Sequence, residues 1–352
     1  MNSVLNNTAP FRLTAEEAEL IRSRFSDIQY DPNGGKDYLL EIRSAAYQTF
    51  PKRLLGRLEA LKHDSASFGI FENLPIDVVH ASPLNDADSI HYKDGYLSEN
   101  IVMGFGSVIA EPYSIHFEGK KIVNDLVPHP STKAEYTGIG SEVELDFHIE
   151  NAALAYHEQG DTSPLGLLLL GVRADPHNTG PKTFVADARE ALKLLSEEDI
   201  STLYSNSFII RQPYRWRNGS THSSKITLHP VLTGSLDHPR VTVAFYPDMV
   251  IPVDHAAKKA YQALYQSIKD VSVGIDIQPG TLVYVNNRFT LHSRQKFSPT
   301  YDENGSPYRW VQRVFLTNNL WNFRDFCRRG DRIYDPSSIR DSENRETTYR
   351  GN

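Results

Sequence analysis

The chain has 352 residues, and its 37 Lys and Arg against 44 Asp and Glu give a formal net charge of −7. Without a basic block it has no electrostatic footprint for nucleic acid. Its single cysteine, Cys327, excludes an internal disulfide framework and Cys-rich zinc sites, and fits a reducing compartment. No apolar run is long enough to cross a membrane, so we expect a cytoplasmic protein without a membrane partner.

The first part of the chain, 1–65, predicts a layer of helices. Thr14 with Glu17 three residues later is a capping-box pattern, in which each side chain satisfies a backbone amide of the other. Residues 38–63 follow with helical spacing of their apolar positions. Pro51 interrupts that spacing, and because proline cannot donate a helical hydrogen bond, we expect two helices there.

Short β-branched and aromatic runs dominate the next part of the chain, between Gly, Pro, Asn and Asp residues. The sheet region opens at 68–71 and includes an apolar, glycine-containing run at 100–106. Later runs are 165–172, 208–212, 241–246, 282–285 and 310–316. This spacing predicts an antiparallel sandwich or barrel, with a core at about 100–320. Residues 188–195 and 255–269 interrupt it as helices.

The remaining organisation is simple. The segment 328–352 is charged and rich in turn residues, so we expect a surface wrap or a partly disordered end. A chain of this length could form one elaborated domain or two. We expect a single domain over 1–352. The sequence leaves a homo-oligomer possible.

A possible metal site lies in the strand-like segment 145–151. There His148 and Glu150 project to the same side, because side chains alternate along a strand. The best third ligand is His292, which follows the strand-like run 281–285. Two histidines and one carboxylate on one face of a metal form the facial triad of non-heme Fe(II) oxygenases. A His-x-Glu tripeptide alone is a weak signal among 13 histidines.

Two arginines follow the distal histidine. Arg309 comes seventeen residues after His292, and Arg313 comes four residues later. Their even separation places both on one face of a strand. Buried guanidiniums need anions, so this face could line a binding cleft. An exposed sheet face with salt-bridged arginines remains the alternative on spacing alone.

Three motifs together resemble the clavaminate synthase-like Fe(II)/2-oxoglutarate oxygenases, which include hydroxylases of free asparagine, arginine and lysine. The motifs are Phe-His-Ile-Glu at 147–150, Lys-Thr-Phe-Val-Ala-Asp at 182–187, and Asn287-Arg288 through His292 to Arg309-Trp310. The resemblance spans about 102–316. It implies a mainly β fold with helical additions, whose core is a double-stranded β-helix (a cupin-like jelly roll).

The same resemblance implies roles for individual residues. His148, Glu150 and His292 would hold Fe(II), while Arg309, assisted by Thr183, would grip the far carboxylate of 2-oxoglutarate. Such enzymes use O2 and 2-oxoglutarate to oxidise a C–H bond, and release succinate and CO2. The presence of Glu150 favours hydroxylation over halogenation. Relative to the family, 303–307 lengthens the interval between His292 and Arg309.

The expected substrate is a free amino acid. By resemblance Arg313 holds the α-carboxylate, and Glu150 can also accept the α-ammonium. His116 and Glu118 lie in a segment that lines the head-group site in the family, with simple loop exposure as the alternative.

The side chain of the substrate is expected to meet Asp248 and Tyr246, in a stretch that binds the side-chain cation in relatives acting on basic amino acids. One carboxylate and one phenol suit a compact ammonium better than a planar guanidinium. The sequence therefore favours L-lysine, hydroxylated at C4 or next at C3, ahead of L-arginine or L-asparagine. The alternative is that Asp248 merely shapes a Pro-Asp turn.

Two further readings stay open. A jelly roll that binds a small ligand without catalysis would use the same scaffold. An oxygenase could also desaturate or cyclise its substrate instead of hydroxylating it.

Overall fold

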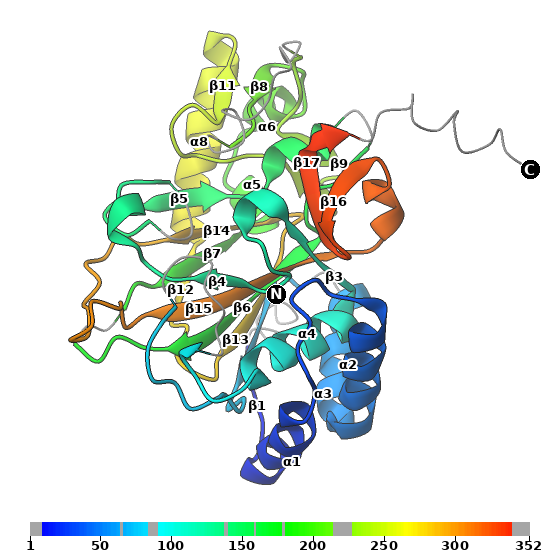
Figure 1. Ribbon diagram of the computed structural model, residues 1–352. Helices are drawn as coiled ribbons and strands as arrows, with labels where there is room; N and C mark the ends of the chain where they lie inside the picture. Colours follow the sequence, from blue (N-terminus) through cyan, green and yellow to red (C-terminus); the bar gives the residue numbers. More distant parts are fainter. Residues whose placement is uncertain are drawn as a thin grey trace, which may run out of the picture.

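The computed structural model describes residues 9–63, 66–83, 91–136, 140–157, 160–177, 180–213 and 227–339. Within these residues the chain folds around two β-sheets (Figure 1). The larger sheet has nine strands in the order β1 (Phe11–Arg12), β2 (Phe68–Glu72), β13 (Leu282–Asn286), β6 (Gly166–Arg173), β15 (Trp310–Thr317), β3 (Glu111–Ile115), β17 (Ile333–Ile339) and β16 (Phe326–Gly330), with β4 (Asn124–Leu126) also paired to β15. The smaller sheet has the order β12 (Val273–Ile275), β7 (Thr183–Asp187), β14 (Thr290–Arg294) and β5 (Leu145–His148).

The two sheets pack against each other through apolar side chains. Leu167 and Leu169 of β6 and Val311 of β15 belong to the same buried cluster as Val185 of β7 and Ile275 of β12. Alternate residues of β6 point the other way, so this strand is buried on both faces and reads as a continuous apolar run. The two-sheet architecture expected from the strand spacing is therefore present.

The predicted N-terminal helices are confirmed. They are α1 (Ala15–Ser26), α2 (Lys36–Thr49) and α3 (Lys52–His63), with the break between the last two at Pro51. The capping box is formed as expected: the Glu17 amide donates to Thr14 Oγ1 at 3.2 Å, and the Thr14 amide donates to Glu17 Oε2 at 2.8 Å.

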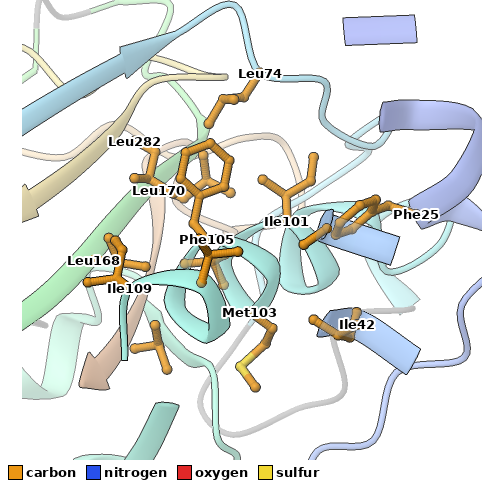
Figure 2. Close-up of a cluster of buried hydrophobic side chains, with 14 of the residues drawn as sticks. Phe25, Ile42, Leu74, Ile101, Met103, Phe105, Ile109, Leu168, Leu170 and Leu282 are labelled. Atoms are coloured by element: carbon orange, nitrogen blue, oxygen red, sulfur yellow. The ribbon is translucent and has the colours of Figure 1, made fainter. Parts of the chain in front are cut away.

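The apolar run at 100–106 differs from its assignment to the sheet region. It lies in a helix, α4 (Leu97–Ile109), in which every residue is buried. A helix that is buried on all sides needs partners on all sides, and α4 packs between the N-terminal helices and the outer face of the larger sheet. Figure 2 shows Phe105 of α4 among Leu74, Leu170 and Leu282, with Phe25 on the side of the N-terminal helices.

The outer face of the smaller sheet is covered by α5 (Ala188–Leu192), α6 (Glu197–Leu203) and α8 (His255–Val271), so both predicted helical interruptions are confirmed. Short pairs formed by β8 (Phe208–Ile210) with β11 (Val250–Pro252), and by β9 (Leu232–Gly234) with β10 (Pro239–Val241), lie in the same part of the sequence. The strand expected over 241–246 is reduced to the end of β10 and a single bridge between Ala244 and His148.

The C-terminal segment is more ordered than expected. Strands β16 and β17 form an antiparallel pair, and β17 continues the larger sheet by pairing with β3. Ile333 and Tyr334 are buried there, which explains why the charged segment does not remain a loose wrap. Residues 340–352 lie outside the described part of the chain, and the single domain over 1–352 stays a prediction.

Short 3-10 helices complete the described elements: η3 (His116–Glu118), η4 (Pro130–Thr132), η5 (Ala152–Tyr156) and η6 (Leu320–Phe323). Among the helices that the structure describes, none is long and apolar enough to cross a membrane.

Candidate active site

The smaller sheet brings the two predicted histidine ligands together. Strands β5 and β14 pair antiparallel with His292 directly opposite His148, and the two imidazole centroids are 4.2 Å apart. Glu150 follows two residues after His148, and its Oε2 lies 3.7 Å from His292 Nε2. One potential ligand atom from each of these three residues lies within 4.8 Å of the others. The arrangement could hold one metal ion.

Neighbouring groups orient these side chains. Nδ1 of His148 lies 2.8 Å from the carbonyl oxygen of Asp146. Because a carbonyl can only accept, this contact places the proton on Nδ1 and leaves Nε2 available for a metal. Asn287 fixes the backbone at Glu150 from both sides: the Glu150 amide donates to Asn287 Oδ1 at 2.8 Å, and Asn287 Nδ2 donates to the Glu150 carbonyl at 3.1 Å.

The protonation states suit a metal site. Burial, and next the charge of His292, lowers the pKa of His148 to about 3. Burial by itself would raise the pKa of Glu150, but Arg313 and the two histidines outweigh it and hold this pKa well below its usual range. At neutral pH the site therefore offers a neutral imidazole and an ionised carboxylate, the forms that bind metals.

A cavity of about 380 Å³ opens beside this cluster. Leu126, Leu167, Leu169 and Val311 of the larger sheet form part of its apolar wall, and polar groups converge on it from the smaller sheet. Apolar walls with a few placed polar groups are typical of small-molecule sites. The predicted residues Thr183, Tyr246, Glu118, Arg309 and Arg313 all line it, in addition to the histidines and Glu150.

Arg309, which is partly buried, presents a cation to the cavity. Burial lowers the pKa of its guanidinium to about 10, so it remains charged at neutral pH. The ring of Phe297 lies 5.5 Å from it, and within the described residues no carboxylate pairs with it. Such a desolvated cation is well suited to receive an anionic ligand.

A second buried arginine was missed from the sequence. Arg294 also lines the cavity, and burial, followed by the charge of Arg309, lowers its pKa to about 10. It lies two residues beyond His292 on β14, and the same i, i+2 rule that united His148 with Glu150 could have found it.

Arg313 forms a different polar group. It donates to Glu118 Oε2 at 2.9 Å, to Glu150 Oε2 at 3.3 Å and to Asn124 Oδ1 at 3.4 Å. Burial opposes its charge, but Glu150 and Glu118 raise the pKa of Arg313 above its usual value. The structure thus joins three predicted residues in one charged group, with Asn124 as an unforeseen member.

Two predicted substrate residues are not brought to the cavity. Asp248 is in a left-handed backbone conformation (φ 64°), its side chain is 63% exposed, and it pairs with Arg211 at 3.6 Å. Asp248 therefore belongs to a turn outside the cavity, which agrees with the alternative that it merely shapes a Pro-Asp turn. His116 in η3 packs against Phe117 and is also absent from the cavity wall. The carboxylate that lines the cavity near Tyr246 is instead Glu135.

A model of the taurine catabolism dioxygenase TauD, TfdA family matches residues 98–315 of the chain. The chain belongs to this family. The matched segment begins within α4 and ends within β15. It includes all three residues of the possible metal cluster and the three arginines of the cavity, Arg294, Arg309 and Arg313. The protein is a dioxygenase that uses Fe(II), 2-oxoglutarate and O2, and the oxygenase reading replaces that of a ligand-binding jelly roll.

Two relatives illustrate the range of the oxygenase group. An L-asparagine oxygenase of Streptomyces coelicolor is 27% identical over 314 residues, which cover 88% of this chain and 89% of the relative. An L-lysine 3-hydroxylase of Catenulispora acidiphila is 24% identical over 195 residues, covering 54% of this chain and 51% of the relative. The resemblance to clavaminate synthase-like oxygenases is confirmed.

A solved structure supports the fold. Asparagine oxygenase in complex with Fe(II), 3-hydroxyasparagine and succinate superposes with a TM-score of 0.78 at 25% identity, covering 93% of this chain and 99% of that one. The jelly-roll core expected from the sequence is therefore confirmed.

Proposed function

We propose that this oxygenase hydroxylates a free L-amino acid, with L-lysine as the first candidate. The observation that carries the proposal is the buried group of Arg313, Glu118 and Glu150 next to the two histidines. A guanidinium beside two carboxylates complements a zwitterionic head group, since the cation can take the α-carboxylate and a carboxylate can take the α-ammonium. The names of both relatives refer to L-amino acids, which supports the same class.

In this proposal His148, Glu150 and His292 hold the iron. Their donor set fits the metal: two imidazoles and a carboxylate on one side, with Nδ1 of His292 buried and without a hydrogen-bond partner in the described residues. When bound, Fe(II) would activate O2, which is the oxidant, while 2-oxoglutarate would supply two electrons and leave as succinate and CO2. Arg309 and Thr183 receive the far carboxylate of 2-oxoglutarate, and Arg294 adds a second positive charge nearby.

Lysine remains the first candidate, although the carboxylate that favours it is not the expected Asp248. Asp248 pairs with Arg211 outside the cavity, but Glu135 places one carboxylate at the cavity wall together with tyrosine side chains. One carboxylate with phenols suits an ammonium better than a guanidinium. Hydroxylation at C4, and next at C3, is retained from the sequence. Free L-arginine and L-asparagine are the alternatives.

The test is a survey of the common free amino acids with Fe(II), ascorbate and 2-oxoglutarate, in which succinate and product mass are measured together. We expect amino-acid-dependent succinate with a product that has gained one oxygen atom. A product that has lost two hydrogen atoms would instead indicate desaturation or cyclisation. Succinate formation that no free amino acid stimulates would contradict the proposal.

A further inference from the structure

Glu135 lies on the loop that connects β4 with β5. The loop is held by backbone hydrogen bonds, from the Glu135 amide to the Thr132 carbonyl at 2.9 Å and from the Glu142 amide to the Lys133 carbonyl at 2.8 Å. Two other charged groups of the loop are already engaged, because Lys133 Nζ lies 2.8 Å from Glu142 Oε1. The half-buried Glu135 lines the cavity, and no hydrogen bond or ion pair from the described residues reaches its carboxylate.

Aromatic rings connect this carboxylate to the ligand cluster. Tyr136, next to Glu135, stacks on Tyr246 with 6.2 Å between ring centroids and 17° between planes. Tyr246 in turn meets the imidazole of His148 edge-on, at 5.3 Å. All four residues line one cavity. A ligand that passes from the histidines toward Glu135 therefore travels along tyrosine rings, which accept methylene groups and attract cations.

The other two carboxylates of the wall are differently placed. Glu118 and Glu150 both pair with Arg313 and serve the head-group end. Glu135 has no such partner within the described wall. A neutral side chain would leave its charge uncompensated beside the ligand, whereas a cationic side chain would pair with it.

We infer that Glu135 is the residue that selects a cationic side chain in the substrate, with Tyr136 and Tyr246 flanking the approach. The inference rests on the proposed amino acid hydroxylation and refines it, and it moves the selecting carboxylate from Asp248 to the loop before β5. A terminal ammonium is a compact charge that one carboxylate can pair with. The substrate class is therefore an L-amino acid with an amine at the end of an unbranched side chain.

The experiment compares L-lysine with L-norleucine, whose side chain has the same apolar stem but no ammonium. Dissociation constants are measured anaerobically by calorimetry on protein loaded with Fe(II) and 2-oxoglutarate, so that no turnover occurs. Wild-type protein should bind lysine more tightly than norleucine. Glu135→Gln should reduce this preference by about tenfold or more while norleucine binding stays unchanged, because only the charge-assisted contact is lost.

Glu142→Gln is the matched control, since it removes a carboxylate of the same loop that is committed to Lys133. It should keep the preference for lysine. The visible charge-transfer band of the Fe(II)–2-oxoglutarate complex reports that each variant remains folded and loaded. Glu135→Lys provides an opposite test: it should favour L-2-aminoadipate, whose side chain ends in a carboxylate, over L-lysine.

Each result decides a separate question. If wild-type protein does not prefer lysine to norleucine, or if Glu135→Gln keeps the full preference, Glu135 is not the selecting residue. If the preference depends on Glu135 but no amino acid stimulates succinate formation, the hydroxylation proposal fails while the binding assignment stands. Stimulated hydroxylation of L-asparagine together with a failed lysine test would keep the enzyme class and overturn the cationic substrate.

Discussion

At the scale of single residues, the three-residue cluster should be needed for metal binding and not for folding. His148→Ala and His292→Ala each remove one of three ligands, so we expect Fe(II) affinity to fall severely and succinate production to be abolished. Circular dichroism should show an unchanged fold, since both side chains face the cavity. His238→Ala, at an exposed position, is the control and should leave both metal binding and succinate production unchanged. Near-normal succinate from either variant would remove that histidine from the site.

The two arginines of the β15 segment should separate the two organic ligands. Arg309→Lys should raise the 2-oxoglutarate concentration needed for half-maximal rate, because lysine cannot reproduce the planar fork of donors. Arg313→Lys should instead raise the KM for the amino acid, since Arg313 contacts Glu118 and Glu150. Steady-state kinetics with each ligand varied in turn measures both effects. Exchanged effects would show that the roles of the two arginines are reversed.

Residue patterns predicted one end of the site better than the other. The i, i+2 pair His148 and Glu150 is local in the sequence, with His148 at the end of β5 and Glu150 two residues beyond it. The cross-strand partner His292 follows a recognisable run. Glu135 could not be placed in this way because it lies on a loop, whose path depends on backbone hydrogen bonds rather than on periodicity. Asp248 was wrongly predicted to line the cavity for the same reason, because it lies in a turn where its side chain pairs with Arg211.

At the scale of elements, the turn between β13 and β14 should support the site through Asn287. Asn287 is 1% exposed, and its side chain forms hydrogen bonds with the backbone of Glu150 and the carbonyl of Pro164. Asn287→Ala leaves these buried groups unpaired, so we expect a loss of about 1–3 kcal/mol in unfolding free energy and weaker Fe(II) binding. Urea unfolding and metal titration measure the two effects. Asn304→Ala in an exposed turn should change neither.

Helix α4 gives a second prediction at this scale. A Cβ atom at Gly104 would lie 2.6 Å from the Phe25 ring, so Gly104→Ala should lower the unfolding free energy by about 1–3 kcal/mol. Gly56 in α3 meets nothing within 4 Å, and Gly56→Ala should raise stability by up to about 1 kcal/mol through helix propensity. Denaturant midpoints compare the two variants. Equal effects would mean that Gly104 is not in close contact with Phe25.

Helices and strands were predicted correctly where one of their faces is apolar. The prediction failed where contacts with the rest of the fold determine whether a segment forms a helix or a strand. The amphipathic N-terminal helices and the alternating strands have periods that can be read directly. After Asn100 the run at 100–106 contains only apolar residues and glycines. Periodicity cannot distinguish a fully buried helix from a buried strand in such a run. For β16 and β17, strand formation depends on the open edge of β3, a partner more than two hundred residues earlier in the chain.

At the scale of the whole molecule, the two sheets enclose a cavity that concentrates buried charge. The larger sheet supplies Arg313 and its neighbour Arg309, and the smaller sheet supplies Arg294 with the histidines. Keeping cations out of water costs free energy unless an anion meets them. Glu118 and Glu150 pair with Arg313, whereas no carboxylate of the described residues pairs with Arg309. The ligand-free fold therefore holds a destabilising feature at Arg309, and binding of an anion should relieve it.

That reasoning gives a prediction for Arg309→Met. Without ligands the variant should be more stable than the wild type by about 1–2 kcal/mol, because an apolar chain of similar length replaces a desolvated guanidinium. When 2-oxoglutarate is present at a hundred times its Kd, the unfolding free energy of wild-type protein with Fe(II) should rise by about 2.7 kcal/mol. The variant should not show this rise. Anaerobic chemical denaturation with and without 2-oxoglutarate measures both quantities. Arg12→Met, at an exposed pair with Glu72, should leave both within about 1 kcal/mol of the wild type. A ligand-free variant that is less stable than the wild type would show that Arg309 already has a compensating partner in the folded chain.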